Sequence, residues 1–165
     1  FLRHAAQSKA GRSAFQAYQL SRKIAHGTNQ KLEALSQLLA DEHGRRTIVF
    51  THDNETAYRV SKRFLVPCIS HQTDVKERRA ILGAFEDGTL PVIVTSRVLN
   101  EGVDMPAAEV AVVLSGTGTV REHVQRLGRI LRPKEGKQAV LYEVVAADTA
   151  EINTSRRRRK HDAYR

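Results

Sequence analysis

Long apolar runs and paired cysteines are both missing from this 165-residue sequence. A membrane-spanning helix needs about 18 or more consecutive apolar residues, and no run approaches that length. We therefore expect no contact with a membrane. The single cysteine, Cys68, excludes a disulfide within the chain and favours a reducing compartment such as the cytoplasm. One cysteine with scattered histidines also lacks the spacing of a zinc site, so we expect no metal ligands in the chain itself.

Two glycine-rich nucleotide-binding signatures are missing as well. No GxxxxGKS/T loop, which would hold phosphates through its backbone amides, occurs anywhere in the sequence. That absence argues against a chain that hydrolyses ATP on its own. No GxGxxG string follows the first predicted strand, which argues against a nucleotide-binding enzyme of the Rossmann type. Such an enzyme is kept here as an alternative.

Acidic residues are scarce at both ends of the chain. The sequence holds 27 Lys and Arg against 18 Asp and Glu, a formal charge of +9. Residues 156–165 carry six basic residues and one acid, and residues 1–27 carry five basic residues and no acid. Such an excess favours polyanionic partners, because neutralising their charges releases counterions. The basic C-terminal tail is compatible with contact to DNA or an acidic partner, and equally with a disordered, solvated end.

Short apolar runs alternate with amphipathic stretches along the chain. Runs rich in β-branched residues predict strands at residues 46–51, 66–69, 90–95, 110–114 and 138–145. Helices are predicted at residues 1–26, 30–41, 55–64, 74–86 and 119–132, with a short basic helix from residue 149. Strands that alternate with helices predict an α/β fold with a mainly parallel sheet and helices on both faces. The first helix is expected to be interrupted at Gly11.

Ligands of such folds collect beyond the carboxyl ends of the strands. The candidate loops are therefore residues 51–54, 70–74, 95–104 and 115–119. In the helix after the last loop, Gln125, Arg129 and Arg132 fall within an arc of roughly 60°. An amide and two permanent cations in one row suit the dispersed charge of a transferring phosphoryl group. The same row also fits the solvated face of an amphipathic helix.

The string QRLGRILRP at residues 125–133 resembles motif VI of superfamily-two helicases, most closely the version found in XPB-type DNA helicases. In that family two arginines of this motif act as arginine fingers on the γ-phosphate of ATP, which the other motor domain holds. The resemblance implies this role for Arg129 and Arg132, with Gln125 beside them.

Residues 95–104 resemble motif V of the same helicases. By that resemblance, Thr95 and Ser96 touch the nucleic-acid backbone. Gly102 and Asp104 would lie at the nucleotide cleft between the two motor domains.

Residues 48–52 resemble motif IV, in which Thr51 or His52 would approach a phosphate of the tracked strand. The next segment of the family usually begins with His-Gly. Here Gln72 follows His71 in place of that glycine. Both a phosphate contact and a local structural role therefore remain open for His71.

The resemblance implies a RecA-like domain, a three-layer sandwich like that of P-loop NTPases. On this basis residues 1–28 are a basic helical lead-in, residues 29–148 the RecA-like helicase C-terminal domain, and residues 149–165 a basic C-terminal tail. The Walker A lysine and the Asp-Glu pair of this family belong to a first RecA-like domain. ATP and Mg²⁺ are therefore expected to bind mainly to that domain, and this chain alone is expected to be inactive.

The function implied is the C-terminal motor half of an ATP-dependent, XPB-like DNA helicase or translocase that serves DNA repair. Its expected partners are DNA and the first RecA-like domain, and the resemblance also allows a nuclease. The expected location is the cytoplasm of a prokaryote, in association with the nucleoid. Two alternatives are the same half of an RNA helicase or chromatin-type motor, and a nucleic-acid-binding adaptor module without chemistry.

Overall fold

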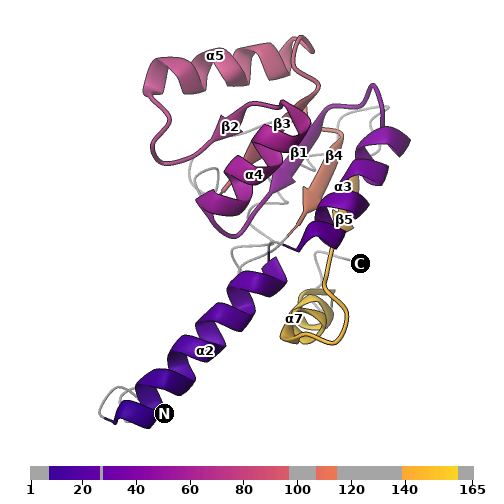
Figure 1. The fold of residues 1–165 in the computed structure, drawn as a ribbon. Coiled ribbons are helices and arrows are strands. Elements are labelled where there is room, and N and C mark those ends of the chain that lie inside the picture. Colours follow the sequence, from indigo (N-terminus) through magenta and orange to yellow (C-terminus); the bar gives the residue numbers. More distant parts are fainter. Residues whose placement is uncertain (1–7, 27, 97–106, 115–138, 160–165) are drawn as a thin grey trace.

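The centre of the fold is a five-stranded, fully parallel sheet (Figure 1). A computed structural model describes residues 8–26, 28–96, 107–114 and 139–159. The strand order is β2-β3-β1-β4-β5, with the short β2 at one edge, as Pro67 beside it predicts. The strands are β1 (Thr47–Phe50), β2 (Cys68–Ile69), β3 (Val92–Thr95), β4 (Val110–Val113) and β5 (Val140–Glu143). The predicted α/β class and parallel sheet are confirmed.

The helices of the body begin at the capping residues that the sequence indicates. They are α3 (Asn29–Asp41), α4 (Asn54–Phe64), α5 (Val75–Glu86) and α7 (Ala150–Arg159), and α2 (Lys9–His26) precedes them. The side chains of Thr28, Asp53 and Asp74 each accept a hydrogen bond from a backbone amide in the first turn of the helix that follows. Each bond satisfies a donor that has no partner within its helix.

Helices cover both faces of the sheet. Side chains alternate between the faces of a strand, so Ile48 and Phe50 of β1 pack with Phe85 of α5 on one face. Val49 points to the opposite face, where it packs with Leu35 of α3 and with residues of α4. These two apolar clusters make the described part of the chain a three-layer sandwich, as predicted.

Helix α2 differs from the prediction in one respect. It runs through Gly11 without interruption, and the hydroxyl of Ser8 accepts a hydrogen bond from the Gly11 amide at 2.9 Å. Ser8 therefore acts as a cap that the sequence analysis missed. The helix projects from the body (Figure 1), and the side chains of Phe15, Tyr18 and Leu20 are 41–58% exposed.

The beginning of the predicted basic tail is folded onto the domain. Residues 150–159 form α7, in which Ser155 is buried and donates a hydrogen bond to Glu143 at the end of β5. Glu151 of α7 forms an ion pair with Lys31 of α3, with 2.5 Å between Nζ and Oε2. Among the described residues, no helix is long and apolar enough to cross a membrane.

Candidate nucleic-acid interface at the strand ends

The structure brings together three of the four residues predicted to contact DNA. Thr51 follows β1, and Thr95 and Ser96 lie at the end of β3, the neighbouring strand. The Thr51 amide donates to the Thr95 carbonyl at 2.9 Å. His52, the fourth candidate, comes directly after Thr51 and is half-buried. The carboxyl-terminal end of the sheet is thus lined with hydroxyl groups at β1 and β3. We call it the strand-end edge.

Two of these three hydroxyl groups are already engaged within the protein. Thr51 and Thr95 are at most 1% exposed, and Ser96 is 3% exposed. The Thr51 hydroxyl donates to the Asp53 carbonyl at 2.9 Å, and that of Thr95 donates to the Ser96 carbonyl at 3.2 Å. A hydroxyl has a single proton to donate, so binding a phosphate oxygen requires Thr51 or Thr95 to give up its internal bond. Their contact with DNA stays a prediction.

A closed triangle of hydrogen bonds continues this edge beyond β2. The backbone amide of Gln72 donates to the Ser70 hydroxyl at 3.2 Å. The same Ser70 hydroxyl lies 3.0 Å from the hydroxyl of Tyr58 on α4. The Tyr58 hydroxyl donates to the side-chain carbonyl of Gln72 at 3.0 Å. Ser70 is buried, and the Ser96 amide donates to Ile69, the residue before it, at 3.4 Å. Tyr58 is therefore linked to the end of β3 through the neighbouring residues Ile69 and Ser70.

His71 has a local partner in the turn after β2. Its Nδ1 lies 2.9 Å from the side-chain nitrogen of Asn54, the first residue of α4. This bond favours the local structural role over the phosphate contact for His71.

Ser70 is the first residue of a loop that the sequence predicts as a candidate site, whereas Tyr58 lies outside all the predicted loops. The only signal for Tyr58 in the sequence was an aromatic residue on the polar face of the 55–64 helix. Its partners, Ser70 and Gln72, lie 12 and 14 positions further along the chain.

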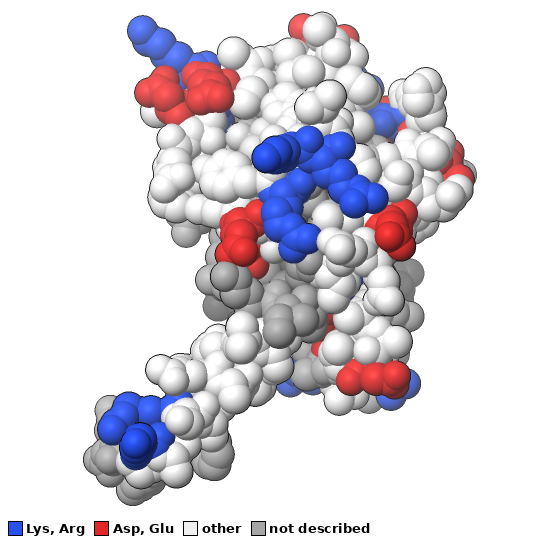
Figure 2. All heavy atoms as spheres, viewed as in Figure 1, with Lys and Arg blue, Asp and Glu red and all other residues white. Residues whose placement is uncertain are grey.

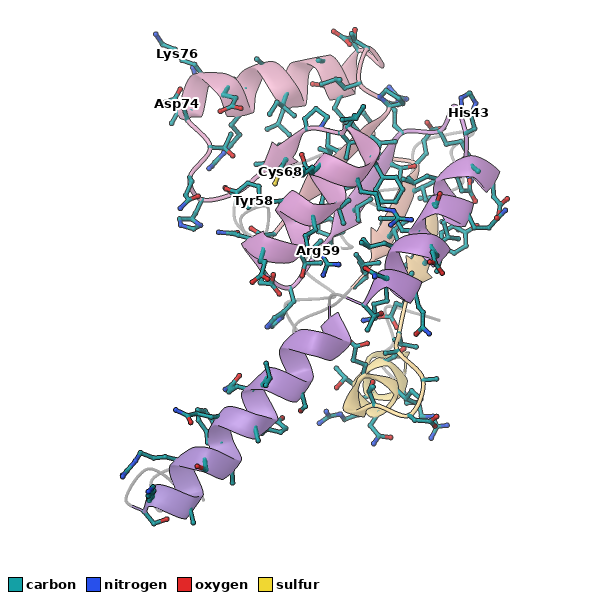
Figure 3. The ribbon with its side chains drawn as sticks, viewed as in Figure 1. His43, Tyr58, Arg59, Cys68, Asp74 and Lys76 are labelled. Carbon is teal, nitrogen blue, oxygen red and sulfur yellow. The ribbon has the colours of Figure 1, made fainter. Side chains whose placement is uncertain are left out.

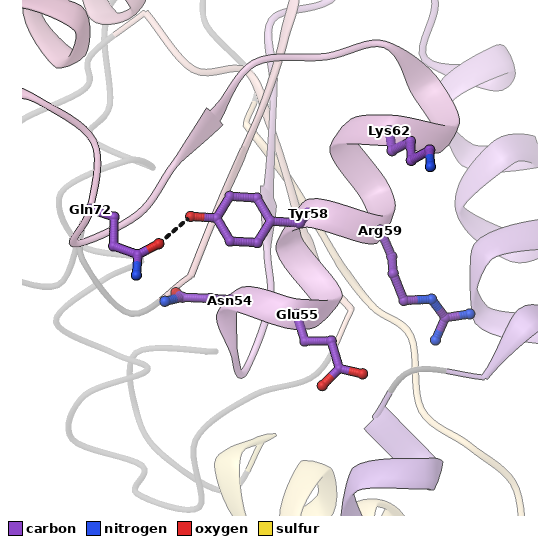
Figure 4. A pocket seen from close by; sticks show the side chains of 6 residues that line it. All are labelled: Asn54, Glu55, Tyr58, Arg59, Lys62 and Gln72. Carbon is purple, nitrogen blue, oxygen red and sulfur yellow. Dashed lines mark hydrogen bonds between the residues drawn. The ribbon is translucent and has the colours of Figure 1, made fainter.

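An open hollow of about 480 Å³ lies on the outer side of α4. Its lining consists of Asn54, Glu55, Tyr58, Arg59, Lys62 and Gln72 (Figure 4). Lys and Arg side chains gather over this part of the molecule (Figure 2). The Arg59 guanidinium donates to the side-chain carbonyl of Asn29 at 3.0 Å, which ties α4 to α3. The hollow thus combines cations, an aromatic ring and amides next to the strand-end edge.

A buried lysine fixes the end of β4. Lys31 is 3% exposed, and its Nζ donates to the Leu114 carbonyl at 3.1 Å as well as to Glu151. Burial lowers the pKa of Lys31 from its ordinary value, against the opposing influence of Glu151. The spacing Lys31, Leu35, Leu38 (i, i+4, i+7) was a signal that the lysine lies on the inward row of α3.

The remaining candidates fall outside the described residues. These are Gln125, Arg129 and Arg132 of motif VI, Gly102 and Asp104 of motif V, and the loop at residues 115–119. The segments that carry them both start from the strand-end edge. Ser96 directly precedes the segment with motif V, and Leu114 directly precedes the segment with the 115–119 loop and motif VI. The Leu114 amide donates to the Phe50 carbonyl at 2.9 Å, so β4 ends beside β1 as β3 does.

Two further sequence expectations concern cysteine and metals. Cys68, the single cysteine, is half-buried, and burial raises the pKa of its thiol to about 11. Within the described residues, no group of three or more His, Cys, Asp or Glu is placed to hold a metal ion.

The C-terminal helicase domain of the ERCC3/RAD25/XPB family matches residues 15–162. The DNA 3′-5′ translocase XPB2 of Sulfurisphaera tokodaii is 47% identical over 156 residues, which are 94% of this chain and 35% of that protein. The DNA 3′-5′ helicase XPB of Mycobacterium tuberculosis is 34% identical over 140 residues, 84% of this chain and 26% of that protein. The chain therefore spans about a third or less of the length of these curated relatives.

Solved structures agree on the fold. The C-terminal domain of the DEAD-box protein Dbp5 superimposes with a TM-score of 0.72 at 21% identity, covering 82% of this chain and 80% of that one. Saccharomyces cerevisiae Dbp5 bound to RNA and ADP BeF3 gives a TM-score of 0.70 at 22% identity, over 79% of this chain and 35% of that one. At these identities the likeness concerns the RecA-like fold alone. The family match over residues 15–162 carries the assignment: this chain belongs to the ERCC3/RAD25/XPB helicases, as their C-terminal helicase domain.

Proposed function

We propose that this chain is the C-terminal motor half of an ATP-dependent DNA helicase or translocase. The observation that carries the proposal is the family match over residues 15–162. The sheet adds that β1, β3 and β4 lie side by side, so their carboxyl ends share one edge. Motif IV ends at that edge, and the segments with motifs V and VI continue from it. DNA is chosen over RNA because the relatives that match at 34–47% identity are named as DNA enzymes.

ATP and Mg²⁺ would be held mainly by a first RecA-like domain. In the part of this chain that the structure describes, the strand-end edge offers hydroxyls and amides, and its acids do not form a cluster suited to Mg²⁺. These residues therefore fit a supporting role in nucleotide binding. Gly102 and Asp104 would line the cleft, and Arg129 and Arg132 would neutralise the charge of the transferring phosphoryl group. Gln125 would lie beside those arginines.

Contact with DNA would follow the strand ends. Thr51, His52, Thr95 and Ser96 would hold successive backbone positions of one strand. Opening and closing of the cleft between the two motor domains would then move this grip along the strand. A DNA-repair role, a nuclease partner and a cytoplasmic, nucleoid-associated location belong to the same proposal and rest on the sequence resemblance alone.

The test joins this chain to the first RecA-like domain of an XPB relative and measures DNA-stimulated ATP hydrolysis. Charge stabilisation by an arginine finger supplies about 10³–10⁵ in rate, so Arg129→Ala or Arg132→Ala should abolish measurable turnover. DNA binding without nucleotide should stay unchanged. Lys76→Ala, which removes an exposed cation on α5, serves as the matched control and should keep full turnover. Turnover by the isolated chain, or by the arginine variants, would refute the proposal.

The adaptor alternative makes the opposite prediction. A module without chemistry would bind nucleic acid alone and would not confer ATP hydrolysis on any first domain. Joining the two domains therefore separates the two proposals in one experiment.

A further inference from the structure

The outer face of α4 has a composition that the strand-end contacts do not explain. Arg59, Lys62 and Arg63 are all exposed on this helix, and Glu55 is the only acid among the residues that line the adjacent hollow. Cations gather over this face (Figure 2). Tyr58, whose side chain is 44% exposed, lies between them and the turn at Gln72 (Figure 4).

We propose that the outer face of α4, formed by Tyr58, Arg59, Lys62 and Arg63 together with Gln72, is a second binding surface for single-stranded DNA. The ring of Tyr58 stacks on a base, and the cations contact the phosphates that follow that base along the strand. The inference rests on the proposed function for its partner, DNA, and goes beyond it by adding a surface outside the helicase motifs.

The tyrosine ring is held in place before any ligand arrives. Its hydroxyl is bonded at 3.0 Å both to Ser70 and to Gln72, while the ring remains partly open to solvent. A tyrosine fixed at its polar end loses little conformational freedom when a base stacks on its ring. Single-stranded nucleic acid is bound in general by this combination of aromatic rings and a cationic track.

The cationic side chains extend the surface along the helix. Between Tyr58 and Arg63 the helix rises by roughly 7.5 Å, which is about two phosphate spacings of a stacked strand. The side chains of Arg59 and Lys62 point to the same side of α4 (Figure 4). Arg59 is oriented by its bond to Asn29.

Hydrogen bonds through buried residues link this surface to the strand-end edge. Tyr58 bonds to Ser70, and the peptide next to Ser70 accepts a hydrogen bond from the Ser96 amide at 3.4 Å. A strand leaving the predicted contacts at Thr95 and Ser96 would therefore meet Tyr58 first and the cations next. Figure 4 shows this order, with Tyr58 between the turn at Gln72 and the side chains of Arg59 and Lys62.

The test measures binding of a short fluorescein-labelled oligothymidylate to the 165-residue chain by fluorescence anisotropy, over a series of salt concentrations. Loss of base stacking should make Tyr58→Ala bind roughly fivefold or more weakly, with an unchanged salt slope. Tyr58→Phe keeps the ring but loses both bonds of the hydroxyl, so it should bind more weakly than the unmodified chain and more tightly than Tyr58→Ala. Lys62→Ala should lower the slope of log Kd against log salt by about 0.7, because one phosphate contact is lost.

The matched control is Lys76→Ala, which removes the same charge from an exposed position on α5. Lys76 lies near the start of α5, and Figure 3 shows its side chain extending away from Tyr58 and Arg59. This variant should change neither the affinity nor the salt slope. Because Lys62 and Lys76 are both exposed, the folded state tolerates both changes, which unfolding by urea verifies.

Three different outcomes would overturn the inference. If Thr51→Ala or Ser96→Ala weakens binding while Tyr58→Ala and Lys62→Ala bind normally, the α4 surface is wrong and the strand-end contacts stand. If the unmodified chain binds no oligothymidylate even at low salt, both the α4 surface and the DNA contacts of the proposed function fail. Equal losses of DNA affinity for Lys62→Ala and Lys76→Ala would also overturn the inference. The effect would then come from the overall charge of the chain and not from the α4 surface.

Discussion

Replacing the buried lysine tests how the sheet, α3 and α7 are joined. Lys31 is 3% exposed and Glu151 14%, and their charged atoms lie 2.5 Å apart. Lys31→Met leaves the Glu151 carboxylate buried without its cation, and removes the Nζ that donates to Leu114. Breaking a buried ion pair on one side costs about 3–5 kcal/mol of the free energy of unfolding. For a chain of this length that corresponds to a fall in Tm of about 6–20 °C.

The double variant Lys31→Met, Glu151→Gln gives the sharper result. Glutamine is uncharged, and its side-chain oxygen can still accept from the Ala146 amide, which donates to Glu151 at 2.9 Å in the unmodified chain. We expect the double variant to be more stable than Lys31→Met alone, because a buried pair replaced by uncharged residues costs little or nothing overall. A double variant as unstable as the sum of both single variants would refute the buried-pair argument.

The pH dependence follows from the direction of the lysine shift. Burial lowers the pKa of Lys31 below its ordinary value of 10.5. Between the lowered pKa and 10.5 the unfolded chain therefore binds more protons at this residue than the folded chain does. The contribution of Lys31 to the free energy of unfolding accordingly rises with pH between these two values. Urea unfolding at a series of alkaline pH values should show this rise in the unmodified chain and not in Lys31→Met.

Three smaller predictions concern single residues. Cys68, with a thiol pKa of about 11 against an ordinary 9.0, should react with iodoacetamide at pH 8 about 100-fold more slowly than in the urea-unfolded chain; equal rates would contradict its burial. Asp53→Ala removes the acceptor of the Thr56 amide and should cost about 0.5–2 kcal/mol in urea unfolding, whereas Asp53→Asn should cost less. Gly83→Ala should stabilise by about 0.5–1 kcal/mol, because a Cβ in this helical position meets nothing within 4 Å, while Gly88→Ala at φ +87° should destabilise.

The described strands and caps could be predicted because they depend on neighbouring residues. The runs at β1 and β4 are buried at every position, so each reads as continuously apolar in the sequence. The caps at Thr28, Asp53 and Asp74 lie directly before their helices and satisfy amides within three residues. Local chemistry of this kind is fully visible in a sequence.

The polar contacts of the site depend on residues distant in the chain. Lys31 meets Leu114 and Glu151 across 83 and 120 positions, and no local pattern reports such a pairing. The same holds for Tyr58, whose orientation is set by the turn after β2. The burial of Thr51 and Thr95 was also unforeseen, because a hydroxyl at a strand end has the same sequence context whether it faces solvent or a backbone carbonyl.

These distant contacts also bear on where the domain ends. The sequence alone puts the boundary before residue 149, yet Glu151 and Ser155 bond to α3 and to the end of β5. Lys31 joins this helix to Leu114, the residue from which the chain enters the segment with Arg129 and Arg132. Under the proposed function, α7 therefore helps to fix the starting point of the arginine-finger segment. Weakening the Lys31 contact should then reduce ATP turnover in the two-domain protein before it unfolds the sheet, whereas changes on the outer face of α4 should alter DNA affinity alone.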